Sequence, residues 1–151
     1  MVQHSAIWYF VHNKVVIATF GGWFIAQSLK VFVGVIREKR FNFKWFVGTG
    51  GMPSSHAAGV SALTAAVGIQ EGVSSALFVV ALMFAVVVIS DAQGVRRASG
   101  KQAEILNRIV EDIYWKKEVK EDRLKELLGH TPIQVWAGIL IGISIAFLVY
   151  S

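Results

Sequence analysis

The sequence contains no cysteine, and only 17% of its 151 residues are charged. The absence of cysteine excludes disulfide bonds and metal sites built from thiolates. A soluble domain usually carries about 25% charged residues, whereas 54% of this chain is hydrophobic and several apolar runs reach the length of a membrane span. This composition excludes an ordinary soluble domain and predicts an integral membrane protein.

Other features are also missing. The chain has no internal repeat, no low-complexity tract and no nucleic-acid-binding motif, so we do not expect nucleic acid as a partner. The first 15 residues lack a basic region followed by a cleavage site, and we therefore expect the N-terminus to be retained.

Four apolar stretches predict an all-α membrane protein with about four transmembrane helices in a single domain, 1–151. The first stretch begins near residue 7 and exceeds the roughly 20 residues that one span needs. Its helix is therefore either tilted or begins in the membrane interface. The expected spans cover about 11–36, 53–69, 73–90 and 132–150.

Local signals refine the second and fourth spans. Pro53 is expected in the first helical turn, where its missing N–H costs nothing, and many small residues predict that this helix is the most tightly packed. Thr131 and Pro132 are expected as the N-cap and first residue of the last span. Gly138 and Gly142 form a GxxxG step, which favours close packing within the chain or between two copies.

A polar segment, 91–130, separates the third and fourth spans and carries nine Lys or Arg and eight Asp or Glu residues. Leu106, Ile109, Val110 and Ile113 recur within it at helical spacing. This pattern predicts one or two amphipathic helices on or near the membrane surface.

The basic residues predict the orientation. Fourteen of the 15 lysines and arginines fall on the side where the first span ends, and only Lys14 falls toward the other. The positive-inside rule makes the basic side cytoplasmic and places both termini outside. The same topology gathers the unusual polar side chains at the cytoplasmic face, where ionisable groups beside spans are functional candidates. These candidates are Lys30, Arg37, Ser54, Ser55, His56, Asp91, Arg96, Arg97 and His130.

Several of these candidates suit a phosphate group. Lys30 and Arg37 are seven residues apart, nearly two helical turns, and point the same way. The glycine-rich turn 48–52 precedes a helix N-terminus, where backbone N–H groups and the helix dipole favour an anion. Hydroxyl and guanidinium donors that match phosphate oxygens are added by Ser54, Ser55, Arg96 and Arg97.

Two histidines, His56 and His130, complete a set that fits phosphoryl transfer without a metal or other cofactor. One histidine would attack phosphorus while the cations stabilise the equatorial oxygens, and the other would protonate the leaving alkoxide. His130 and its neighbours also fit the boundary between two helices, since Thr131 and Gln134 match a capping box.

Lys30 and Arg37, followed by Pro-Ser-Ser-His at 53–56, resemble the first two motifs of the type 2 phosphatidic acid phosphatase and vanadium haloperoxidase superfamily. The chain is most similar to the small divergent family of that group. The similarity lies in GGMPSSHAA around Pro53, DAQGVRRASGKQAEILN at 91–107 and LKELLGHTP at 124–132. Superfamily members are metal-independent phosphatases with a phosphohistidine intermediate, and many act on lipid phosphates.

The resemblance implies that Lys30 and Arg37 bind phosphate, that Ser54 and Ser55 lie in the phosphate loop, and that His56 is the general acid. In the superfamily, a third motif places the nucleophilic histidine a few residues after an arginine, with a carboxylate four positions further on. That arginine would be Arg96 or Arg97. Here the later histidine is His130, and the position four beyond it is Gln134.

Asp91 is a candidate for the missing orienting carboxylate, as is Glu104, although Asp91 also fits an ion-pair partner or an N-cap. The resemblance therefore implies a phosphatase for a lipid or polyprenyl phosphate monoester. The distribution of basic residues predicts that it acts at the cytoplasmic face, and we expect the membrane to be a bacterial plasma membrane. Its partners would be the membrane and the phosphorylated lipid. A homodimer would add bulk, because four spans is fewer than usual for the superfamily.

The interrupted third motif favours an alternative, a non-catalytic phosphate-binding module or an accessory subunit of a membrane complex. A lipid or ion transporter is disfavoured, because the chain lacks inverted halves and its charges lie at a face instead of the bilayer midplane.

Overall fold

The computed structural model describes residues 5–39, 51–114 and 130–151, without the side chains of 95–98 and 111–114. Every regular element in these ranges is an α-helix, as predicted. The helices are α1 (Ala6–Val11), α2 (Lys14–Glu38), α4 (Ser55–Glu71), α5 (Ala76–Gln93), α6 (Val95–Tyr114) and α7 (Pro132–Tyr150).

Three of these helices, α2, α5 and α7, are long and apolar enough to cross a membrane. The fourth expected span, α4, has 17 residues, at the lower end of the roughly 17–25 residues that span a bilayer. It is lined by small residues and is more buried than its neighbours, as expected for the helix at the centre of the packing. The chain is a membrane protein with three candidate spans, and the fourth stays a prediction.

The first apolar stretch is two helices instead of the expected single one. Asn13 interrupts it, because its Oδ1 accepts hydrogen bonds from the N–H groups of Val15 at 2.8 Å and Val16 at 3.4 Å. A side chain in this position starts a new helix by capping its free N–H groups. The residues before it form α1, whose aromatic side chains are exposed.

Two other helix boundaries also differ from expectation. Pro53 was expected inside a helix, but α4 begins at Ser55 with Ser54 as its N-cap. The third span was expected at 73–90, but Ser75 caps α5 through a 3.1 Å bond from Phe78 N–H, and α5 runs to Gln93. Asp91 consequently lies in the last turn of α5 instead of following it.

The bundle core is formed by α2, α4 and α7, which pack through small residues. A Cβ atom added to Gly138 would collide with the backbone carbonyl of Ser54, and one added to Gly142 would collide with that of Ala58. The GxxxG step of α7 therefore packs against α4 within the chain. Of the two alternatives left open by the sequence, the structure uses the internal one.

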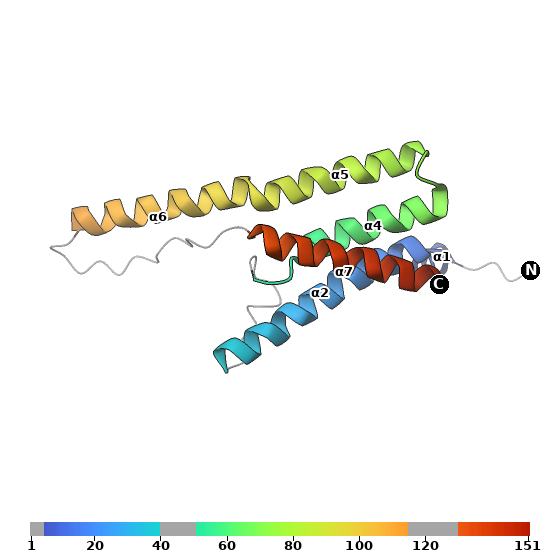
Figure 1. The fold of residues 1–151 in the computed structure, drawn as a ribbon, viewed down its shortest axis with the longest axis horizontal. Coiled ribbons are helices and arrows are strands. Elements are labelled where there is room, and N and C mark those ends of the chain that lie inside the picture. Colours follow the sequence, from blue (N-terminus) through green and yellow to red (C-terminus); the bar gives the residue numbers. More distant parts are fainter. Residues whose placement is uncertain (1–4, 40–50, 115–129) are drawn as a thin grey trace, which may run out of the picture.

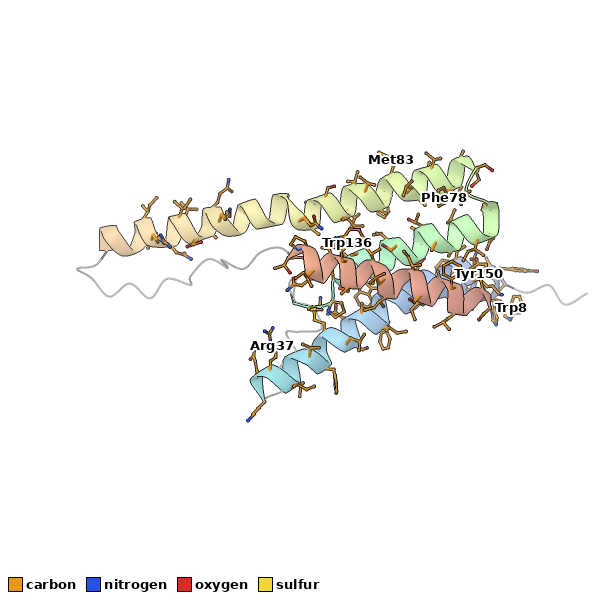
Figure 2. All side chains as sticks on the ribbon, in the orientation of Figure 1. Trp8, Arg37, Phe78, Met83, Trp136 and Tyr150 are labelled. Atoms are coloured by element: carbon orange, nitrogen blue, oxygen red, sulfur yellow. The ribbon has the colours of Figure 1, made fainter. Side chains whose placement is uncertain are left out.

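Helix α5 packs on the outer side of α4. Thr64 Oγ1 donates to the Ala81 carbonyl at 3.2 Å, and the Phe78 ring lies against Gly68. Met83, by contrast, points away from the bundle, as Figure 2 shows. A helix buried on one narrow alanine stripe and apolar elsewhere suits contact with lipid.

One end of the bundle collects the residues predicted to be functional. As Figure 1 shows, α2 and α5 end there, and α4 and α7 begin there; we call this the site end. Helix α6 continues beyond it along the direction of α5 (Figure 1). That the polar segment lies along the membrane surface stays a prediction. At the opposite end, Tyr150 donates through its hydroxyl to Gln70 Oε1 at 2.8 Å.

Candidate functional site

Lys30 lies in the third quarter of α2 and is buried, with 7% of its surface exposed. Its Nζ donates hydrogen bonds to Gln27 Oε1 at 3.1 Å and to Ser55 Oγ at 3.3 Å. The first partner is one turn earlier on the same helix. The second is the first residue of α4, so Lys30 joins α2 to the N-terminus of the central helix.

Both of these partners are neutral, and no carboxylate in the described part of the chain pairs with Lys30. An ammonium has three N–H donors, and two of them are used in these bonds. Burying a cation without a counter-ion is costly. The surroundings of Lys30 therefore favour an anion as its further partner.

The segment that approaches Lys30 from the other side begins at Gly51. This residue has φ +85°, and an added Cβ would meet the Lys30 stem at 3.3 Å. Both the left-handed backbone and the close approach require glycine here. The segment then enters α4 through Ser54, which is fully buried, and Ser55, which is 1% exposed. Glycine thus lets the backbone pass directly over the lysine that it covers.

Ser54 connects this segment to α7. Its N–H donates to the Gln134 carbonyl at 2.9 Å, and its side chain caps α4 by accepting from Ala57 N–H. The N-terminal turns of α4 and α7 are therefore fixed against each other. Free N–H groups at helix N-termini attract anions, and here one such terminus lies beside the buried ammonium.

His130 directly precedes Thr131, the N-cap of α7, and is 3% exposed. Its backbone N–H donates to the Ala92 carbonyl at the end of α5, at 3.1 Å. Its ring Nδ1 lies 3.2 Å from Gln134 Oε1, one turn into α7. Backbone and side chain together hold the imidazole at the site end, between the last turn of α5 and the first turn of α7.

Gln134 has two roles in this arrangement. Its Oε1 accepts from the N–H of Thr131 at 3.1 Å, which confirms the capping box and the expected start of α7. The same oxygen contacts the ring of His130. The sequence offered helix capping and histidine orientation as competing interpretations, and the structure shows one oxygen making both contacts.

The remaining predicted site residues are distributed over α2, α4, α5 and α6. His56 is half-buried in the first turn of α4, and Asp91 is half-buried beside Ala92 in the last turn of α5. Arg37 is exposed about two turns beyond Lys30 on α2, near the end that has left the bundle, as Figure 2 shows. The side chains of Arg96 and Arg97 lie outside the described residues, although their backbone forms the first turn of α6.

Gln27 is the site residue that the sequence did not identify. It is 4% exposed and accepts from Lys30 Nζ. An amide inside an apolar run belongs to no motif, but its spacing of three residues from Lys30 places both on one helix face. That spacing was the available signal.

Comparison with known proteins is consistent with this geometry. Residues 11–145, nearly the whole chain, match the family described as the divergent PAP2 family. The chain belongs to this family. One similar protein is the uncharacterized membrane protein YuiD of Bacillus subtilis (strain 168). It is 41% identical over 129 residues, which cover 78% of this chain and 82% of the relative. No solved structure matches the chain significantly.

Membership of the divergent PAP2 family confirms the resemblance seen in the sequence, and the relative's name agrees with a membrane location. The family's position beside the phosphatases makes a phosphate-related role the first function to test.

Proposed function

We propose that the protein is a phosphatase that hydrolyses a lipid or polyprenyl phosphate monoester at the site end. The observation that carries this proposal is the buried Lys30 ammonium, which has two neutral partners and lies against the N-terminus of α4. A phosphate group would supply the missing negative charge and enough oxygens to use the remaining donors.

Binding would begin with the phosphate at Lys30 and Ser55. The ammonium contributes a point charge, and the N-terminal turn of α4 contributes backbone N–H groups and the positive end of its dipole. Arg37, exposed two turns further along α2, would hold the outer phosphate oxygens or the headgroup side of the substrate.

Hydrolysis would follow in two steps. A ring nitrogen of His130 attacks phosphorus with its lone pair, the bond between phosphorus and the lipid oxygen breaks, and His56 gives its proton to the departing alkoxide. Water then attacks the phosphohistidine and gives a proton to His56, which releases inorganic phosphate and frees His130. Splitting the reaction this way replaces one difficult displacement by two easier ones, and Lys30 would stabilise the charge on the equatorial oxygens.

A lipid substrate fits the position of the site. The site end terminates a bundle whose outer helices present apolar side chains, so a phosphate there would lie near the membrane interface while its tail stays in hydrocarbon. The topology expected from the sequence puts fourteen of the 15 lysines and arginines on the side of this end, which supports a cytoplasmic position.

The test is phosphate release by the full chain in detergent, from several lipid and polyprenyl phosphates, with a chelator present. We expect turnover in the wild type and its loss, by about 10²-fold or more, in His130→Ala and His56→Ala. Exposed His12, at the opposite end, supplies the matched control His12→Ala, which should retain full activity. Full activity of His56→Ala would contradict the mechanism.

A second candidate is a non-catalytic phosphate-binding module. It is favoured by residue 134, where a glutamine that contacts the His130 ring stands in place of the carboxylate that commonly orients a catalytic histidine. Binding of vanadate or lipid phosphate that depends on Lys30, without turnover of any substrate, would support this candidate over the phosphatase.

A further inference from the structure

The amide of Gln134 has one oxygen that faces two nitrogen atoms. One is the backbone nitrogen of Thr131, at 3.1 Å, and the other is Nδ1 of His130, at 3.2 Å. Both distances are within the range of N–H to oxygen hydrogen bonds. The protonation of a histidine ring is inferred from its hydrogen-bond partners. The identity of this shared atom therefore determines whether Nδ1 of His130 carries a hydrogen.

The backbone N–H of Thr131 fixes the orientation of the amide. A peptide N–H can only donate, so the side-chain atom that faces it must be the oxygen of Gln134 and not its NH₂ group. An amide oxygen in turn can only accept. Nδ1 of His130, which contacts the same oxygen, must therefore carry a hydrogen.

We propose that Gln134 is a positioning residue that holds His130 as the Nδ1–H tautomer and leaves the lone pair on Nε2. Free imidazole side chains favour the opposite tautomer, so the contact selects a form that the ring would not adopt by preference. The assignment of the tautomer stands on the hydrogen bonds alone. Its use, with Nε2 as the atom that attacks phosphorus, rests on the proposed function.

The helix cap holds the Gln134 oxygen in place and thereby strengthens the selection of the Nδ1–H tautomer. The Gln134 side chain is held by Thr131 N–H at the start of α7, so its oxygen cannot turn away without uncapping the helix. The backbone of His130 is held separately by Ala92.

The test reads the ring nitrogens directly, by ¹⁵N NMR of the full chain in detergent with labelled histidine. The signals of His130 are identified by their absence in His130→Asn. We expect a protonated Nδ1 and an unprotonated Nε2 in the wild type, above the pH at which the ring is charged. In Gln134→Leu the ring should change to the Nε2–H form, and kcat should fall by on the order of 10²-fold with little change in KM.

Gln134→Glu is the matched variant, because its carboxylate can accept from both Thr131 and His130 and keeps the cap. It should retain the Nδ1–H tautomer, which also carries the test where Gln134→Leu does not fold. An Nε2–H ring in the wild type or in Gln134→Glu would overturn the proposal, as would an Nδ1–H ring in folded Gln134→Leu. A protein with the expected tautomer and no turnover on any phosphate would refute the phosphatase and support the positioning role of Gln134.

Discussion

At the scale of single residues, the charge of Lys30, which no carboxylate among the described residues balances, sets the chemistry that we propose for the site. Its two partners are the neutral side chains of Gln27 and Ser55. An uncompensated buried charge lowers the stability of the fold by an amount on the order of several kcal/mol. Proteins commonly keep a destabilising group where their function needs it. Removing the charge of Lys30 should therefore lower activity without lowering stability.

Replacing Lys30 by methionine keeps the length and apolar stem of the side chain and removes the charge. We expect phosphate release to fall by about 10²–10³-fold, the usual effect of losing one group that stabilises transition-state charge. Thermal unfolding followed by circular dichroism should show a stability equal to or above that of the wild type, because no charge remains buried.

The matched control is Lys101→Met, which removes an exposed lysine from α6 at the same end of the molecule. It should change neither turnover nor unfolding temperature. Equal loss of activity in the two variants would show that general positive charge matters and that the buried position of Lys30 does not.

The sequence predicted part of this residue-scale picture. It placed Lys30, Ser55 and His130 at one face, and the structure brings them to the site end; their chemical roles stay predictions. It did not give Gln27, because an amide inside an apolar run belongs to no motif, although its spacing of three residues from Lys30 was an available signal. Nor could it show that one oxygen of Gln134 serves two nitrogens, since that depends on a rotamer.

At the scale of helices, the register of α7 against α4 is set by glycine. Gly142 touches the backbone of α4 directly, whereas Gly21 on α2 has ordinary room, with Ile145 at 3.5 Å from an added Cβ. A glycine-to-alanine substitution can therefore be compared at a tightly packed position, Gly142, and at one with room for a methyl group, Gly21.

We expect Gly142→Ala to lower the free energy of unfolding by about 1–3 kcal/mol, because the added methyl must push two helices apart. Gly21→Ala should be neutral or stabilising by up to about 1 kcal/mol, since alanine favours the helix and meets no backbone. Thermal unfolding of both variants in detergent checks this. Equal effects at the two positions would argue against the glycine contact as the determinant of packing.

The helix ends show where sequence-based prediction stopped. Apolar length located the three candidate spans, but the helix boundaries that differ are set by single caps, at Asn13, Ser54 and Ser75. Hydropathy changes gradually along the chain and locates a helix end only to within a few residues. Within that range, the hydrogen bond made by a capping side chain sets the first residue of the helix. Thr131, by contrast, was predicted as the N-cap of α7, because proline and glutamine follow it at the expected spacing.

At the scale of the whole molecule, two levels of aromatic residues bracket the bundle. Trp8 and Tyr150 lie at the opposite end, and Trp136 lies on α7 toward the site end, as Figure 2 shows. Tryptophan and tyrosine gather at both surfaces of a bilayer. Their placement supports an axis of insertion that runs along the bundle, with the site near one surface.

Orientation across the membrane can be measured because the chain has no native cysteine. A cysteine at the exposed position Lys101 should react with a membrane-impermeant maleimide from the cytoplasm only. A cysteine at the exposed position Ser74, in the turn between α4 and α5, should react from outside only. Reaction of both from the same side would refute the proposed topology.

The backbone bonds that join Ser54 to Gln134 and His130 to Ala92 have a consequence for biosynthesis. They join the start of α7 to the start of α4 and to the end of α5. Of the described helices, α7 is the last to leave the ribosome. Until α7 packs against α4 and α5, Lys30 has its partners Gln27 and Ser55, but His130 is not yet held at α5, so a nascent or prematurely terminated chain would lack the proposed catalytic centre. Activity would therefore appear only after synthesis has passed α7, and it would report completed insertion.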